Sequence, residues 1–215
     1  LAVLLELATP GLNVETATAR VYHTTYAAHI LGTVGLMDAD EYEYYKELDY
    51  PMNAVVGKDG LERAFEEYLH GRDGRMRTTV TADGRIVEQR IIQEPEPGQN
   101  VQVTIDLSLQ QTSEDALEEV ILKLREEGIG RNSEGRDAEG GAVVVEEVST
   151  GRVLACASYP SFDLSTYSQD IASLSEDRYA PLYNRALLAP YPPGSVFKMV
   201  TTIAMIDIGH IGRFY

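Results

Sequence analysis

The 215-residue sequence predicts an α+β protein made of two domains. Apolar side chains recur with helical spacing over residues 108–127, which predicts a long amphipathic helix. Two apolar runs around a Ser-Thr-Gly turn predict an antiparallel hairpin over 141–159. Residues 94–98 hold two prolines and a glycine, which stop both kinds of periodic structure, so we expect domains at 1–98 and 99–215.

Short elements marked by caps and turns fill the first domain. Asp38 and Asp40 stand where the positive end of a helix dipole favours acids, and Pro51 ends that helix. Gly71 suits the C-terminal cap of a later helix, and residues 82–85 suit a hairpin turn. In order, we expect the end of a helix over 1–8, a strand over 12–22, a short helix and turn over 26–34, helices over 38–50 and 60–69, and a hairpin over 78–92.

The second domain starts with an alternating segment and ends with an apolar one. Alternation over 100–105 predicts a strand, and the almost fully apolar segment 195–208 predicts a buried helix. Between them we expect the helix over 108–127, a Gly-rich loop over 128–140, the hairpin over 141–159 and an irregular surface segment over 160–190. The apolar face of the long helix should carry Leu109, Ala116, Leu117, Val120, Ile121 and Leu124. Because an isolated hairpin is only marginally stable, we expect its open edge to be covered.

The charge balance is strongly acidic. Asp and Glu total 34 against 18 Lys and Arg, which gives a formal net charge of -16. Such a surface repels phosphate, which argues against nucleic-acid binding and against docking on anionic lipid through a basic patch. We expect no transmembrane helix in these residues. The chain begins without Met in what looks like a helix, so we expect it to be a piece of a longer protein.

Few side chains outside one motif suggest chemistry. The single cysteine, Cys156, excludes an internal disulfide framework and a Cys-rich zinc site, and its apolar surroundings predict a buried, unreactive thiol. The four histidines are scattered, and adjacent acid pairs such as Glu66-Glu67 should face solvent. We therefore expect neither a metal nor a cofactor.

Ser195 and Lys198 are the main candidates for catalysis. Their spacing places both side chains on one turn at the start of a helix. A serine hydroxyl becomes a good nucleophile when a base takes its proton, and a lysine whose pKa is lowered by burial can be that base. A bare S-x-x-K pattern also arises by chance, and a serine after Pro-Gly is a common N-cap. The Pro-Pro-Gly entry and the apolar helix that follows favour the catalytic interpretation.

Residues 191–198 (YPPGSVFK) resemble the active-site serine motif of class B penicillin-binding proteins, the peptidoglycan transpeptidases. Other segments resemble the same family in the expected order. In the transpeptidase domain these are Val103–Gln110, Gly141–Phe162 and Asn184-Arg185-Ala186. In the N-terminal pedestal, or dimerisation, domain they are Pro10–Glu15, Arg20–Tyr22, Ala27–Gly35, Val56–Glu62 and Tyr68–Gly71.

This resemblance implies a pedestal domain followed by the start of a serine-transpeptidase domain. It implies that Ser195 is the nucleophile and Lys198 its general base, with Gly194, Asn184 and Arg185 in supporting positions. The substrates would be peptidoglycan stem peptides, cross-linked through a serine acyl-enzyme, and β-lactams would acylate the same serine. The family also implies proteins of the wall-synthesis complex as partners. It implies a place on the extracytoplasmic face of the bacterial membrane, through an anchor absent from this chain.

The family also uses S-x-N and K-T-G motifs downstream of the serine, and neither occurs in these 215 residues. We therefore expect this chain to be a fragment that is inactive alone, although its parent is an enzyme. One alternative is a non-catalytic pedestal or interaction module of the wall-synthesis complex. Another is a β-lactam sensor or serine β-lactamase, against which the pedestal-like first hundred residues argue.

Overall fold

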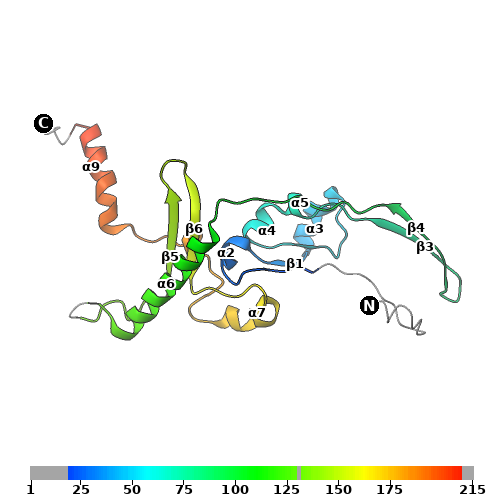
Figure 1. Cartoon of the computed structure of the whole chain (residues 1–215), viewed down its shortest axis with the longest axis horizontal. Helices are drawn as coiled ribbons and strands as arrows, with labels where there is room; N and C mark the ends of the chain where they lie inside the picture. The colour runs from blue at the N-terminus through cyan, green and yellow to red at the C-terminus, as the bar shows by residue number, and fades with distance from the viewer. Residues whose placement is uncertain (1–18, 130–131, 210–215) are drawn as a thin grey trace.

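A computed structural model of the chain describes residues 19–129 and 132–209. Figure 1 shows an elongated arrangement with an extended two-stranded hairpin near one end and the last helix, α9 (Lys198–Asp207), at the other. The expected helix over 1–8 and most of the strand expected over 12–22 lie outside the described residues. Residues 19–22 form no strand, so the described part of that prediction is wrong.

The first half consists of short elements around a two-stranded sheet. They are α2 (Ala28–Leu31), β1 (Val34–Leu36), α3 (Ala39–Tyr45), the 3-10 helix η1 (Lys46–Leu48), β2 (Val55–Gly57), α4 (Gly60–Ala64) and α5 (Glu66–Leu69). Strands β1 and β2 pair antiparallel. The helix expected over 60–69 is broken at Phe65, whose ψ of 19° departs from helical geometry. The C-terminal cap of α5 is His70 and not the expected Gly71, which follows with a left-handed φ of 78°.

Helix α3 starts where the acids predicted it. The side chain of Asp38 accepts hydrogen bonds from the main-chain nitrogens of Asp40 and Glu41, and Glu41 Oε2 accepts one from Asp38 N at 3.0 Å. This reciprocal capping box satisfies donors that the first helical turn leaves without partners. The helical path ends with η1, two residues earlier than expected from Pro51.

The hairpin predicted over 78–92 is confirmed and is longer than expected. It consists of β3 (Arg75–Val80) and β4 (Ile86–Gln93), which pair antiparallel with two register irregularities. Gly84 lies in the connecting turn with a φ of 83°, a conformation that glycine adopts without strain.

The second half is built on α6 (Leu107–Glu127) packed against the hairpin of β5 (Gly141–Glu147) and β6 (Arg152–Tyr159). Both elements are confirmed. Leu117 and Ile121 of the helix form the buried core with Ala157, and Leu124, Ala138, Val143 and Tyr159 pack around it. The buried face differs from the expected one: Gln110 and Ser113 are buried, whereas Ala116 and Val120 are exposed.

The buried side chain of Gln110 has its polar groups satisfied by hydrogen bonds to the main chain of β6. Its Oε1 accepts a hydrogen bond from Cys156 N at 2.7 Å, and its Nε2 donates to Cys156 O at 3.0 Å. Nearby, Thr104 Oγ1 donates to Val153 O and the main-chain nitrogen of Asp106 donates to Leu154 O. The strand predicted over 100–105 is wrong, because isolated bonds to β6 do not make a ladder.

The remaining predictions for the second half need two corrections. The segment 160–190, expected to be irregular, contains α7 (Tyr167–Glu176) and α8 (Arg185–Leu188). The helix expected over 195–208 forms as η2 (Gly194–Phe197) followed by α9, but residues 191–209 are all exposed. The burial predicted from the apolar composition of this helix is therefore wrong for the described residues. Burial requires a covering surface, and the described residues do not supply one. The Gly-rich loop expected over 128–140 has no helix or strand in its described part.

Candidate functional site

The Ser195–Lys198 motif lies where one helical segment passes into the next. Gly194 opens η2 with a φ of 57°, a left-handed conformation that disfavours a side chain even though open space surrounds it. Ser195 lies within η2, and Lys198 is the first residue of α9. The two side chains therefore start from one helical turn, as the spacing predicted.

Both side chains are exposed in this chain. Among the described residues no hydrogen bond joins the Ser195 hydroxyl to the Lys198 ammonium. In α9 the hydroxyls of Thr201 and Thr202 donate to the carbonyl oxygens of Phe197 and Lys198. Ser195 and Lys198 are thus close in sequence and lie on one turn, and both are open to solvent here.

Asn184 lies at a junction of three elements. Its Nδ2 donates to the main-chain oxygen of His29 in α2 at 3.1 Å, and its Oδ1 accepts from Leu187 N at the start of α8. The same oxygen accepts from Ser158 Oγ of β6, and that hydroxyl accepts from Ala186 N at 3.0 Å. Asn184 thus fixes the start of α8 against both halves of the chain.

Arg185 is buried, with 8% of its surface exposed. Its guanidinium donates to the main-chain oxygens of Tyr179, Ala180 and Tyr183. A Cβ at Gly140 would clash with the main-chain oxygen of Tyr159 and would lie 2.6 Å from Nε of this arginine, so glycine is required there. Arg185 therefore organises the loop before α8. Within the described residues, neither Asn184 nor Arg185 makes a hydrogen bond with Ser195 or Lys198.

His29 and Glu114 join the two halves, and no local sequence pattern indicates either role. His29 Nε2 lies 2.7 Å from Pro181 O, to which it donates, and the ring packs edge-on against Phe162. Burial lowers the pKa of His29. Glu114 Oε1 accepts from Ala27 N at 2.8 Å, and burial raises the pKa of this carboxyl.

Cys156 is buried, and its burial raises the pKa of the thiol. The burial predicted for Cys156 is therefore confirmed, and a thiol with a raised pKa carries little thiolate. The residues in 19–129 and 132–209 contain no cluster of three or more side chains suited to hold a metal ion. Over the same ranges, none of the helices combines the length and apolar character needed to cross a bilayer.

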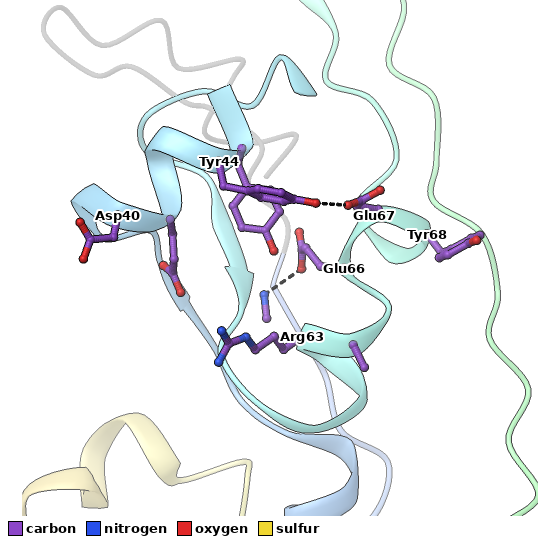
Figure 2. A pocket seen from close by; sticks show the side chains of 10 residues that line it. Asp40, Tyr44, Arg63, Glu66, Glu67 and Tyr68 are labelled. Atoms are coloured by element: carbon purple, nitrogen blue, oxygen red, sulfur yellow. Dashed lines mark hydrogen bonds between the residues drawn. The ribbon is translucent and has the colours of Figure 1, made fainter. Parts of the chain in front are cut away.

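A cavity of about 610 Å³ lies in the first half, away from Ser195 (Figure 2). The Tyr44 hydroxyl donates to Glu67 at 2.8 Å, and Glu66 Oε2 accepts from Gly57 N at 2.8 Å. Glu66 is only 5% exposed, so the expectation that it faces solvent is wrong. The break before α5 turns this side chain inward.

His70 lies beside the buried carboxylate of Glu66. Its Nδ1 is 3.0 Å from Glu66 Oε1, an oxygen that accepts no well-aligned hydrogen bond within the part of the chain described. The His70 ring also stacks on Tyr50, with 4.0 Å between centroids. The close carboxylate raises the pKa of His70, and partial burial opposes this shift. This group is a structural ion pair in the first half.

Comparison with known protein families gives two matches. Residues 5–103 match the Penicillin-binding Protein dimerisation domain, and residues 141–213 match the Penicillin binding protein transpeptidase domain. Peptidoglycan D,D-transpeptidase MrdA of Escherichia coli K12 is 31% identical over 214 residues, which cover 95% of this chain and 31% of that protein. The chain thus spans about a third of the length of the curated relatives it matches.

Solved structures give the same picture. A chain from a peptidoglycan synthase complex, studied for its structural coordination of polymerization and crosslinking, is similar with a TM-score of 0.72 and 32% identity. The match covers 91% of this chain and 34% of that one. Penicillin-binding protein PBP2 of Helicobacter pylori, solved in complex with MreC, is similar with a TM-score of 0.64 and 26% identity over 89% of this chain and 33% of that one.

Proposed function

Because this chain belongs to the class B penicillin-binding proteins, we propose that it carries the nucleophile, Ser195, and the general base, Lys198, of a peptidoglycan D,D-transpeptidase. The observation that carries the proposal is their placement on one helical turn, inside the segment that matches the transpeptidase domain. Gly194 sets the backbone entry to that turn. Asn184 and Arg185 support it from a distance by fixing the start of α8.

The proposed reaction is acyl transfer. Ser195 Oγ attacks the carbonyl carbon between the two terminal D-alanines of a stem peptide while Lys198 Nζ takes the hydroxyl proton. An ester bond forms, the C–N bond breaks, and the terminal D-alanine leaves with the proton that the lysine returns to its nitrogen. The amine of a neighbouring stem peptide then attacks the ester and releases the serine. A β-lactam ring would acylate Ser195 by the same first step.

We also propose that these 215 residues alone do not form the acyl-enzyme at the usual rate. Both Ser195 and Lys198 are exposed to solvent here. The S-x-N and K-T-G motifs, which would complete the cleft and part of the oxyanion site, do not occur in the sequence.

Labelling with a fluorescent penicillin tests both proposals. The protein encoded by the full open reading frame that contains this chain should be labelled by the penicillin. Ser195→Ala in that protein should abolish the label. The 215-residue chain should remain unlabelled at the same penicillin concentration. Cys156→Ala serves as the control, because its thiol is buried and lies outside the motif. Labelling that survives Ser195→Ala would remove the nucleophile assignment, and equally fast labelling of the short chain would remove the second proposal.

The domain division is proposed near residues 94–98. This segment forms no helix, and the main chains of Arg72 and Glu96 bond each other in both directions, which ties it to the first half. We propose that the first half docks proteins of the wall-synthesis complex, a role supported by similarity to a PBP2 solved with MreC. We propose that the protein acts on the extracytoplasmic face of the bacterial membrane. The match to a dimerisation domain over residues 5–103 does not favour a lone β-lactamase.

A further inference from the structure

The β3–β4 hairpin is an exposed two-stranded ribbon. It projects from the first half in Figure 1. All but one of its strand residues are exposed, so both faces of the ribbon are open to solvent. Within the described residues each strand pairs only with the other, so both outer edges carry unpaired main-chain groups. Two-stranded ribbons are marginal in water, and a third strand would supply the missing pairing.

One face of the ribbon carries a pair of arginines, and the Thr79–Glu88 pair lies beside it. Arg77 and Arg90 are direct cross-strand partners, so their side chains share this face, and neither forms an ion pair with the described part of the chain. Directly opposed like charges destabilise a strand pair. Residues 72–93 hold five arginines against three acids, in a chain whose formal net charge is -16. An acidic group bound between the two arginines would remove their repulsion.

The opposite face carries two apolar pairs, one on each side of the Thr78–Gln89 pair. Met76 pairs with Ile91 and Val80 pairs with Ile86, and each of these side chains is 55–58% exposed. Met76 and Val80 alternate with Arg77 along β3, so the apolar and basic side chains point to opposite sides. The ribbon therefore presents two chemically different faces joined by open strand edges.

We propose that an extended protein segment with alternating acidic and apolar residues adds to one edge of this ribbon as a third strand. Side chains of an added strand alternate between faces, so its acids would meet the arginines while its apolar residues extend the Met76–Ile91 face. A membrane surface would meet only one face at a time. It could not contact the basic and the apolar side chains together, which is why the arrangement fits a strand better than anionic lipid.

Binding of synthetic peptides to the 215-residue chain tests the proposal. The probe is an eight-residue peptide of alternating Glu and Val with blocked ends, and the comparison peptide alternates Lys and Val. Binding of the Glu-Val peptide should slow amide hydrogen exchange along one of the two strands. Added salt should weaken this binding. The double substitution Arg77→Glu with Arg90→Glu should weaken the affinity for the Glu-Val peptide at least tenfold. It should also permit binding of the Lys-Val peptide.

Matched variants separate charge from folding. Arg77→Gln with Arg90→Gln removes the positive charges without adding acids, and should abolish the preference between the peptides. Arg136→Glu with Arg152→Glu, two exposed arginines outside the ribbon, should leave binding unchanged. Protection by both peptides equally, or by neither, would overturn the proposal. The proposal would also be overturned if the ribbon bound phosphatidylglycerol vesicles but not phosphatidylcholine vesicles, and the Glu-Val peptide protected neither strand.

Discussion

The side-chain amide of Asn184 donates a hydrogen bond to the main-chain oxygen of His29, 155 residues earlier in the chain. The asparagine caps the start of α8, which leads towards Ser195, and the histidine belongs to α2 in the first half. A single side chain thus connects the first half of the chain to the segment that precedes the proposed nucleophile.

Asn184→Ala should lower the free energy of unfolding by about 2–3 kcal/mol, because it removes an N-cap and two further hydrogen bonds. Chemical denaturation measures this loss. Asn184→Asp keeps the oxygen that caps α8 but loses the donor to His29, so it should be milder. Asn53→Ala, at an exposed position, is the control. Equal stability losses at positions 53 and 184 would contradict the bridging role.

Gln110→Leu should destabilise the chain by about 2–4 kcal/mol. The leucine would leave both main-chain polar groups of Cys156 buried without partners, and burial of such groups is costly. Gln111→Leu on the same helix is the matched control, since Gln111 is only half-buried. Thermal or denaturant unfolding distinguishes them. If Gln110→Leu were as stable as the wild type, the inferred role of this glutamine would be wrong.

His29 should make stability depend on pH. Burial lowers its pKa below the ordinary 6.5, so near and below that pH the unfolded chain binds more protons than the folded one. Its contribution is therefore full above pH 6.5 and falls as pH drops towards the lower folded pKa. The stability difference between wild type and His29→Gln should shrink when pH falls from about 7.5 to about 5.5. A difference that grows over this range would contradict the sign.

His70 should behave in the opposite way. The Glu66 carboxylate raises its pKa above 6.5, so its contribution to stability is full below pH 6.5 and is lost as pH rises through the folded pKa. Ring signals in NMR spectra measure that pKa directly. Glu66→Gln should lower it, whereas Glu67→Gln should leave it nearly unchanged because Glu67 binds Tyr44 instead. A pKa that does not respond to Glu66→Gln would show that another group causes the shift.

Local signals explain which elements could be predicted. The helix α6 and the two long hairpins depend on periodicity and turn residues that lie within a few positions of one another. The strand expected over 100–105 failed because alternation alone does not provide a partner strand with a continuous ladder. Helices α7 and α8 were missed because one has no side-chain cap and the other has four residues.

The sequence by itself determined the family resemblance and the Ser195–Lys198 spacing, because both are properties of consecutive residues. Only the tertiary structure revealed the burial of Glu66 and the contacts of Gln110, Asn184 and Arg185. Those depend on backbone groups brought close from distant parts of the chain, which no local pattern encodes. The tertiary structure also decided that α9 is exposed in this chain, since the burial of an apolar helix depends on the surface that packs against it.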